Sequence, residues 1–349
     1  MSLPTVVVGA TQVPFQHGGA EWHASALLCQ LRARGFRAEL VQLPFQWDPR
    51  EAALRSALAW RLLDFTQAGG LPVDLFIGTR FPSYAARHPA KVVWLFHQFR
   101  QAYDLHEAGL DGFPETPEGQ TLRRHVIELD TQALRECRRI FTTSRNNALR
   151  LRRFNGLEAE VLRLPLDEPQ AFWAEDYQPF VLSVGRLVSL KRVDLLLRAM
   201  SHLPPAAEAR IVGEGPERAA LETLAGQLGL GERVRFLGRL GDAETRALYA
   251  RAGAVFYAPW DEDYGLVTLE AFQARRPVVT THDAGGPLEF VSHEVTGLVA
   301  EPTPESVAAA LARLLREPGL ARRLGEAGHA AVAGLSWDDV VSALTGWAR

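Results

Sequence analysis

The sequence predicts an α/β protein with two doubly wound parallel sheets, and three observations support this fold class. Short apolar runs alternate with longer amphipathic segments over most of the 349 residues. This rhythm is typical of parallel strands covered by helices on both faces of a sheet. The rhythm breaks at 164–179, which contains three prolines and no periodicity, and then restarts. A chain of this length is long enough for two such domains.

Each predicted strand is a short apolar run of the kind that is buried on both faces. In the first half the runs are 5–10, 38–43, 73–78, 91–96 and 139–144. In the second half they are 179–185, 209–213, 234–238, 254–259, 276–281 and 296–300. Helical patterns include 21–34, 123–138 and a long region at 304–333. We therefore expect one domain over 1–166, a second over 167–335, and a last helical segment within 336–349.

The composition is that of an ordinary globular protein, with 47% apolar and 23% charged residues. A formal net charge of -3 argues against a nucleic-acid-binding protein, which usually has a basic domain or stripe. Cys29 and Cys137 are too few for a disulfide framework, and we expect buried free thiols. The first residues lack the pattern of a signal peptide, and no apolar run approaches the length of a membrane span. These observations predict a cytoplasmic location.

Two basic residues follow the predicted strand at 179–185. Arg186 comes directly after Gly185, and Lys191 lies five positions further on, where a helix is expected to begin. Lys191 is one of only two lysines in the chain. Fixed cations beside a helix N-terminus are what a nucleotide diphosphate requires. The alternative is two solvated surface charges.

Two glutamates flank a glycine in the stretch 258–291. Gly265 permits close backbone approach where the helix 266–274 is expected to begin. Glu262 is predicted in the preceding loop and Glu270 inside the helix, so that the two reach different parts of one ligand. Carboxylates accept hydrogen bonds from sugar or ribose hydroxyls. The alternative is a helix-terminal charge at Glu262 and a plain exposed Glu270.

Two glycine-containing turns accompany these residues. The segment 212–218 has Gly-x-Gly without the third glycine of a dinucleotide fingerprint, so it is a weak signal of nucleotide binding. The loop 280–287 is rich in glycine, and its backbone amides are suited to an anion. A plain connection is the alternative for both turns.

Six signals then follow one another in a characteristic order. They are GRLVSLKR (185–192), VGEGPE (212–217), VRFLG (234–238), DEDYGLVTLEAF (261–272), GGPLEFV (285–291) and TGLV (296–299). Their order and spacing resemble the nucleotide-sugar-binding half of the family 4 retaining glycosyltransferases, which have the GT-B fold. The first half resembles the family more loosely, through segments at 18–21, 96–104 and 142–154. One departure is Asp263-Tyr264-Gly265, where the family usually has Gly-Phe-Gly.

The resemblance implies two Rossmann-like domains that face each other across a donor and acceptor cleft. It implies transfer of a hexose from a UDP- or GDP-linked sugar to a glycan or lipid-linked acceptor, with retention and with no metal or other cofactor. Arg186 and Lys191 would hold the donor diphosphate and stabilise the leaving group. Glu262 would face the donor sugar, Glu270 would take the ribose hydroxyls, and His97 would stand at the reacting face.

The remaining assignments also rest on the resemblance. Gly18 and Gly19 would close against the diphosphate, and the last helix would cross back onto the first domain. The implied catalytic residues are His97, Arg186, Lys191 and Glu262. The implied donor-binding residues are Gly18, Gly19, Gly185, Arg186, Lys191, Gly213, Leu237, Glu262, Tyr264, Gly265, Leu266, Val267 and Glu270.

Other functions stay open at this point. Asp261-Glu262-Asp263 is an Asp-x-Asp pattern that binds a divalent cation in a different glycosyltransferase fold. A sugar-nucleotide epimerase or isomerase, and a nucleotide-sugar-binding protein without turnover, are further alternatives. The arginines of 145–154 are a solvated helix face or, alternatively, a peripheral contact with the inner face of a membrane.

Overall fold

The structure is a computed structural model that describes residues 4–15 and 19–346. The chain divides into two compact units, Met1–Pro165 with Ser336–Arg349, and Leu166–Leu335. Each unit contains a six-stranded sheet in which neighbouring strands are parallel. The predicted fold class, two doubly wound α/β domains, is confirmed. In the described ranges no helix is long and apolar enough to cross a membrane.

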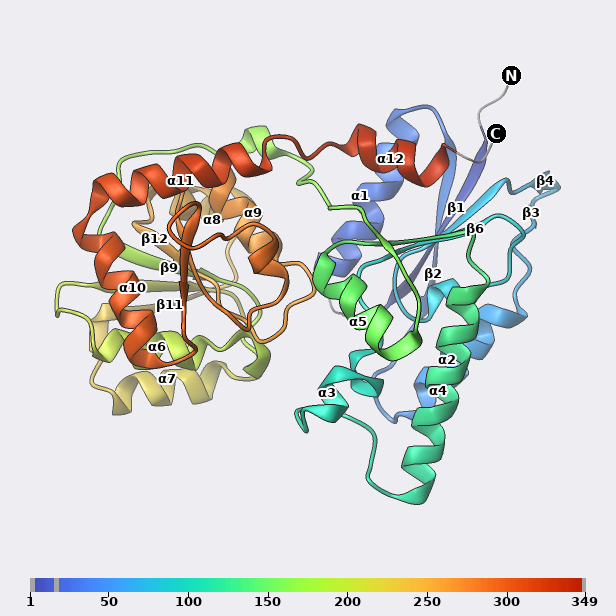
Figure 1. Ribbon diagram of the computed structural model, residues 1–349, viewed down its shortest axis with the longest axis horizontal. Helices are drawn as coiled ribbons and strands as arrows, with labels where there is room; N and C mark the ends of the chain where they lie inside the picture. Colours follow the sequence, from blue (N-terminus) through green and yellow to red (C-terminus); the bar gives the residue numbers. More distant parts are fainter. Residues whose placement is uncertain (1–3, 16–18, 347–349) are drawn as a thin grey trace. The chain divides into compact units, whose positions relative to one another are not determined.

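The first unit has the strand order β2-β1-β5-β6-β7-β8, with a separate small hairpin of β3 and β4 (Figure 1). Its strands are β1 (Thr5–Gln12), β2 (Arg37–Pro44), β3 (Gln67–Ala68), β4 (Leu71–Pro72), β5 (Leu75–Gly78), β6 (Lys91–Leu95), β7 (Arg139–Thr142) and β8 (Glu160–Val161). Its helices are α1 (Gly19–Ala33), α2 (Glu51–Leu62), α3 (Asp104–Glu107), α4 (Pro117–Arg135), α5 (Arg145–Asn155) and α12 (Trp337–Thr345).

Alternation along β6 shows how this sheet is covered on both faces. Val93 belongs to the core that α2 and α4 form with the sheet. The next residue, Trp94, points to the other face because successive strand residues alternate. There it contacts His23 of α1 and Trp337 of α12, at ring-centroid distances of 4.3 and 5.9 Å. The last helix of the chain therefore packs against the first unit, where Arg34 also donates to Asp338 at 2.8 Å.

The second unit has the strand order β11-β10-β9-β12-β13-β14. Helices α6, α7 and α10 cover one face of its sheet, and α8, α9 and α11 cover the other (Figure 1). Its strands are β9 (Phe180–Val184), β10 (Glu208–Val212), β11 (Val234–Gly238), β12 (Ala254–Phe256), β13 (Val278–Thr281) and β14 (Gly297–Ala300). Its helices are α6 (Val193–Ser201), α7 (Arg218–Gln227), α8 (Asp242–Arg251), α9 (Leu266–Gln273), α10 (Pro304–Arg316) and α11 (Pro318–Val332).

Three sequence-based expectations differ from the structure. The helical region predicted at 304–333 is two helices, because Pro318 has no amide to continue α10 and begins α11 instead. Helix α4 begins earlier than predicted, where the Thr116 side chain caps it and Pro117 takes the first helical position. Both cysteines are free as expected, but Cys29 is exposed, so the prediction that both are buried is wrong.

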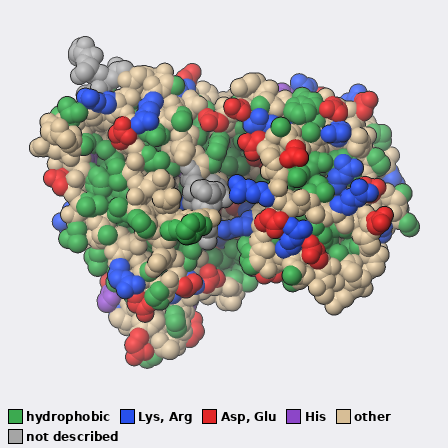
Figure 2. All heavy atoms as spheres, turned by 180° about the vertical axis from the view of Figure 1, so that it is seen from behind, with side chains coloured by type: hydrophobic (Ala, Val, Ile, Leu, Met, Phe, Trp, Pro, Cys, Tyr) green, Lys and Arg blue, Asp and Glu red, His purple; other side chains and the backbone are tan. Residues whose placement is uncertain are grey.

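Charged side chains are mixed over the surface drawn in Figure 2. Lys and Arg side chains lie among Asp and Glu side chains on this face of both units. On this face the charges of the two signs are therefore interspersed and do not form one large patch of a single sign.

Candidate functional site

The strand order of the second unit indicates where a ligand is expected to bind. From β9 the chain moves outward to β10 and β11 on one side, and then returns to β12 on the other side of β9. The carboxyl ends of β9 and β12 are thus the topological switch point, where ligands bind in open α/β sheets. Most of the sequence-predicted donor residues follow β9 or β12 in the chain.

The loops after β9 and β10 touch through their backbones. Gly185 and Gly213 have φ values of 150° and 134°, in the region that favours glycine. A Cβ on Gly213 would lie 1.9 Å from the Gly185 carbonyl oxygen. The Gly213 amide donates to the Gly238 carbonyl at 2.8 Å, which fixes this turn to the end of β11. Leu237, also predicted to bind the donor, lies half-buried one residue earlier in β11.

The two predicted diphosphate cations lie in different environments. Arg186 is exposed, and no ion pair joins it to the residues that the structure describes. Lys191 lies at the end of a short 3₁₀ turn, Ser189–Lys191, directly before α6, and its side chain is only 22% exposed. The Leu187 amide between them donates to the Glu214 carbonyl at 2.9 Å, which ties the β9 loop to the β10 loop.

Lys191, Tyr257 and Glu262 form a compact cluster, which we call the lysine cluster. The Lys191 ammonium donates to the Tyr257 hydroxyl at 3.0 Å and forms an ion pair with the Glu262 carboxylate. Burial by itself lowers the pKa of Lys191, but the Glu262 carboxylate and the Tyr257 hydroxyl raise it above its ordinary value. Burial and the Glu262 carboxylate raise the pKa of Tyr257. At neutral pH the cluster thus contains an ammonium and a neutral phenol.

The sequence placed Lys191 and Glu262 in separate roles and did not reveal that they touch. The Glu262 backbone is fixed on both sides: its amide donates to the Ala284 carbonyl at 2.8 Å, and its carbonyl accepts from the Gly286 amide at 2.7 Å. A Cβ on Gly286 would lie 2.5 Å from the Tyr264 Cα. The glycine-rich loop 280–287 therefore supports the loop that carries Glu262.

Helix α9 carries the second glutamate. Its N-cap, Gly265, has a φ of 85°, and a Cβ there would lie 2.9 Å from Cε1 of Tyr257. Leu266 and Val267 follow as the first two helical residues, whose amides have no acceptor within the helix. Glu270 lies on the same helix, and its carboxylate accepts a hydrogen bond from the Tyr249 hydroxyl at 2.7 Å.

The environment of Glu270 differs from that of Glu262. Burial raises the pKa of Glu270, and the hydrogen bond from Tyr249 partly opposes this shift. Tyr249 is fully buried, and burial and Glu270 together raise its pKa well above the ordinary value. Glu270 is thus a largely buried acceptor with one neutral donor already in place.

A second, partly exposed contact joins two loops of the site. The Arg192 guanidinium donates to both carboxylate oxygens of Asp283, each at 2.8 Å, and to the Ala258 carbonyl at 2.8 Å. Burial alone would raise the pKa of Asp283, but hydrogen bonds from Arg192 and Thr281 lower it below its ordinary value. Arg192 therefore joins the segment after β12 to the end of β13.

Of the other residues predicted for the donor site, one packs in the core of the second unit and the rest belong to the first unit or lie outside the described residues. The Tyr264 ring is fully buried and packs on Phe290 at a ring-centroid distance of 5.5 Å. His97 and Gly19 belong to the first unit: His97 follows β6, with Nδ1 2.8 Å from the Gln98 carbonyl oxygen, and Gly19 begins α1. Gly18 lies outside the described residues.

The Asp-x-Asp pattern does not form a group of metal ligands in the described part of the chain. Nowhere in that part do three or more His, Cys, Asp or Glu side chains gather in a way that could hold a metal ion. Asp263 is buried, with 7% of its surface exposed, and Glu262 between the two aspartates contacts the Lys191 ammonium. Glu262 therefore already has a cationic partner.

Four residues of this site were missed by the sequence analysis: Tyr249, Tyr257, Arg192 and Asp283. Tyr257 lies in the predicted apolar strand 254–259, and Tyr249 lies in α8, a helix that the sequence analysis did not predict. Arg192 carries a sequence signal, since it adjoins Lys191, but its left-handed conformation (φ 50°) is visible only in the structure.

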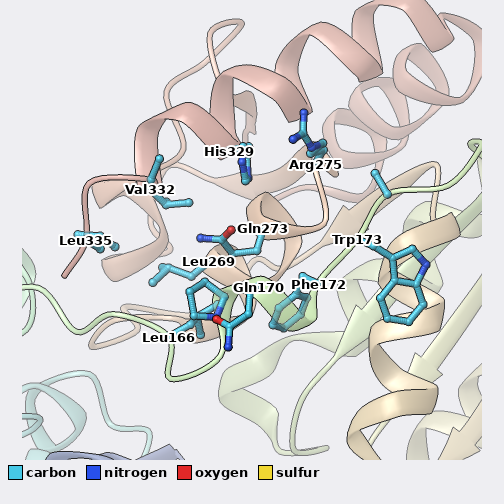
Figure 3. A pocket seen from close by; sticks show the side chains of 13 residues that line it. Leu166, Gln170, Phe172, Trp173, Leu269, Gln273, Arg275, His329, Val332 and Leu335 are labelled. Atoms are coloured by element: carbon cyan, nitrogen blue, oxygen red, sulfur yellow. The ribbon is translucent and has the colours of Figure 1, made fainter. Parts of the chain in front are cut away.

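A separate cavity of about 510 Å³ lies between the segment 166–174, α9 and α11 (Figure 3). Its lining combines apolar side chains with Gln170, Gln273, Arg275 and His329. None of the predicted site residues lines it. Its Phe172 ring packs on Tyr249 at a centroid distance of 6.1 Å, so the cavity lies behind the tyrosine that holds Glu270.

The second unit thus has a Rossmann-like fold with a charged cluster at its topological switch point. Residues 167–331 match the family described as Glycosyl transferases group 1. The second unit is therefore similar to this family, and the resemblance predicted from the sequence is confirmed over these residues.

Individual relatives agree with this assignment. A D-inositol 3-phosphate glycosyltransferase of Mycobacterium avium is 36% identical over 192 residues, which are 53% of this chain and 42% of the relative. An alpha-1,3/1,6-mannosyltransferase of Homo sapiens is 32% identical over 168 residues, 44% of this chain and 40% of the relative. The chain thus spans about two fifths of the length of these curated relatives.

Solved structures resemble the chain over nearly its whole length. The sucrose-phosphate synthase of Thermosynechococcus elongatus has a TM-score of 0.78 at 20% identity, covering 98% of this chain and 97% of its own. Anabaena HepE, solved in complex with UDP and glucose, has a TM-score of 0.68 at 18% identity, covering 97% and 96%. At these identities the likeness shows the fold, which is the GT-B fold.

Proposed function

We propose that the protein is a retaining glycosyltransferase that moves a hexose from a nucleotide-diphosphate sugar to a glycan or lipid-linked acceptor. The observation that carries the proposal is the lysine cluster at the carboxyl ends of β9 and β12, with the exposed Arg186 in the same β9 loop. Two cations, one exposed and one partly buried, next to a helix N-terminus suit a diphosphate leaving group. The match of the second unit to the group 1 glycosyl transferases supports the same reaction class.

Each charged group then has a role in the proposed reaction. Lys191 and Arg186 bind the diphosphate, and the first amides of α9 add donors to it. Glu262 faces the donor sugar, and Glu270 accepts hydrogen bonds from the ribose hydroxyls. His97, carried by the first unit, is assigned to the reacting face by the family resemblance.

The chemistry is a substitution at the anomeric carbon. The bond between that carbon and the terminal diphosphate oxygen breaks, and a bond to an acceptor hydroxyl oxygen forms on the same face of the sugar. The acceptor proton passes to the departing diphosphate. Fixed positive charge that faces the leaving group stabilises the transition state, and we propose that Lys191 and Arg186 supply it without a metal ion.

The identity of the donor is proposed from the relatives. HepE binds UDP and glucose, and the human relative is a mannosyltransferase. UDP-linked and GDP-linked hexoses are therefore the first donors to test.

The test has two stages. Thermal-shift screening with UDP, GDP and their hexose derivatives should raise the melting temperature, because a ligand of the folded state stabilises it by mass action. The donor that binds is then incubated with glycan and lipid-linked acceptors, with and without a chelator. Transfer that withstands the chelator supports the proposal; loss of transfer that manganese restores contradicts its metal-free part.

Location is proposed as cytoplasmic, with a peripheral membrane contact through α5 as the second possibility to test. Arg152 and Arg153 are each 68% exposed and paired, with Glu158 at 3.1 Å and with Glu107 at 2.7 Å. These pairs favour a solvated helix face. Sedimentation with anionic vesicles decides between the two: salt-sensitive binding supports the membrane contact, and its absence dismisses it.

A further inference from the structure

We infer that Tyr257 is a positioning residue of the donor site. It holds the Lys191 ammonium in place while that ammonium exchanges the Glu262 carboxylate for the donor diphosphate. The inference rests on the proposed function, since it gives Lys191 a diphosphate to bind.

The position of Tyr257 is fixed from several sides. It directly follows β12, and its amide donates to the Val279 carbonyl at 3.0 Å. The side chain is 5% exposed. Its ring edge lies so close to Gly265 that no side chain fits between them, because a Cβ there would lie 2.9 Å from the ring. The hydroxyl is therefore held at one point by a ring that has little room to turn.

The two partners of Lys191 differ in what they do when an anion arrives. Glu262 is negative, and a diphosphate would compete with it for the ammonium and be repelled by it. Tyr257 is uncharged, and its hydroxyl accepts a hydrogen bond from the ammonium at 3.0 Å without repelling the incoming anion. The ammonium also lies 5.3 Å from the centroid of the Tyr257 ring, within the range of a cation–π contact.

A lysine ammonium with a single hydrogen-bond partner moves when that partner moves. The Lys191 side chain is long and carries rotatable donors, so without the Tyr257 hydroxyl Glu262 is the hydrogen-bond partner that holds it among the described residues. In the wild-type protein the hydroxyl is the contact that persists when the Glu262 pair opens. Tyr257 thus acts on the diphosphate through Lys191.

Tyr257→Phe removes the hydroxyl and keeps the ring. We expect the affinity for UDP or GDP, whichever binds the wild-type protein, to fall about tenfold by calorimetric titration, as expected for loss of a hydrogen bond to a charged group. The matched control is Tyr177→Phe, which loses a tyrosine hydroxyl that donates to the Arg275 carbonyl at 2.8 Å, outside the lysine cluster. It should retain wild-type affinity.

A double-mutant cycle separates positioning from a general structural effect. In a Lys191→Met background, Tyr257→Phe should change the diphosphate affinity by less than about twofold, because the group through which it acts is gone. An equal loss in both backgrounds, or wild-type affinity in the single variant, overturns the inference and leaves the proposed function intact. A wild-type protein that binds neither UDP nor GDP overturns both.

Discussion

The loop that carries Glu262 and the helix that carries Glu270 hold their carboxylates in different ways. Glu262 is paired with the Lys191 ammonium, whereas Glu270 accepts a hydrogen bond from the neutral Tyr249 hydroxyl. In the proposed site, the first carboxylate restrains the cation that would bind the donor diphosphate, and the second is an acceptor available to the ribose hydroxyls. The proposal therefore requires an exchange of partners at Lys191 on binding and requires none at Glu270.

The comparison also predicts different responses to pH. Lys191 has a raised pKa and stays charged through neutral pH. Glu270 has a pKa raised by burial, so it takes up a proton at a higher pH than an ordinary glutamate. Acidification should therefore neutralise Glu270, at the proposed ribose end, and leave the Lys191 ammonium charged.

The largest expected effect comes from Lys191→Ala. The substitution removes the cation proposed to face the leaving group and leaves the Glu262 carboxylate beside the diphosphate without its ammonium partner. We expect kcat for transfer to fall by about 10²–10³-fold. The control is Arg198→Ala, an exposed arginine on α6, which should retain the wild-type rate. A wild-type rate in Lys191→Ala would remove the lysine from the mechanism.

Glu270→Ala should act on binding instead of turnover. Loss of the acceptor leaves the ribose hydroxyls without their partner, and the affinity for UMP or GMP should fall about tenfold. Calorimetric titration measures this, with Glu222→Ala on the exposed surface of α7 as the control. A fall in kcat with unchanged nucleotide affinity would reverse the roles of the two glutamates.

Tyr249→Phe tests the predicted pH response of Glu270. The Tyr249 hydrogen bond lowers the pKa of Glu270 against the raising effect of burial. Without it the Glu270 pKa rises further, so nucleotide affinity should begin to fall at a higher pH than in the wild-type protein. Titrations across the acid range test this shift; an acid limb that stays in place or moves to lower pH would contradict it.

The smallest effect is expected from Asp283→Ala. The Arg192–Asp283 pair is only partly exposed, at 17% and 28%, and it joins the segments after β12 and β13. Its loss should lower the free energy of unfolding by about 1 kcal/mol, measured by urea denaturation. A stability equal to wild type would show that the other hydrogen bonds of Arg192 suffice.

Much of the second unit could be predicted from local sequence. The apolar runs predicted the strands, and Gly265 predicted the start of α9 with Glu270 inside it. The break at Pro318 and, in the first unit, the cap at Thr116 also have sequence signals, and the predicted helix bounds missed them. These features depend only on residues near one another in the chain.

The contacts of the site could not be predicted in this way. Lys191 is 66 positions from Tyr257 and 71 from Glu262, and they meet only because β12 returns to lie beside β9. Tyr257 and Tyr249 resemble core residues in their local patterns, and burial is indeed part of what they do. Their hydroxyl partners depend on the order of strands in the sheet, which the local pattern does not contain.

The central claim is that Lys191 leaves Glu262 to bind the donor diphosphate while Glu270 holds the ribose. Calorimetric titration of wild-type protein and Lys191→Ala, with the diphosphate and the monophosphate of the nucleoside that binds, tests it most directly. The account predicts that wild type prefers the diphosphate and that this preference collapses in Lys191→Ala, with monophosphate affinity largely kept. A preference that survives the substitution, or a wild-type protein that binds neither nucleotide, would contradict it.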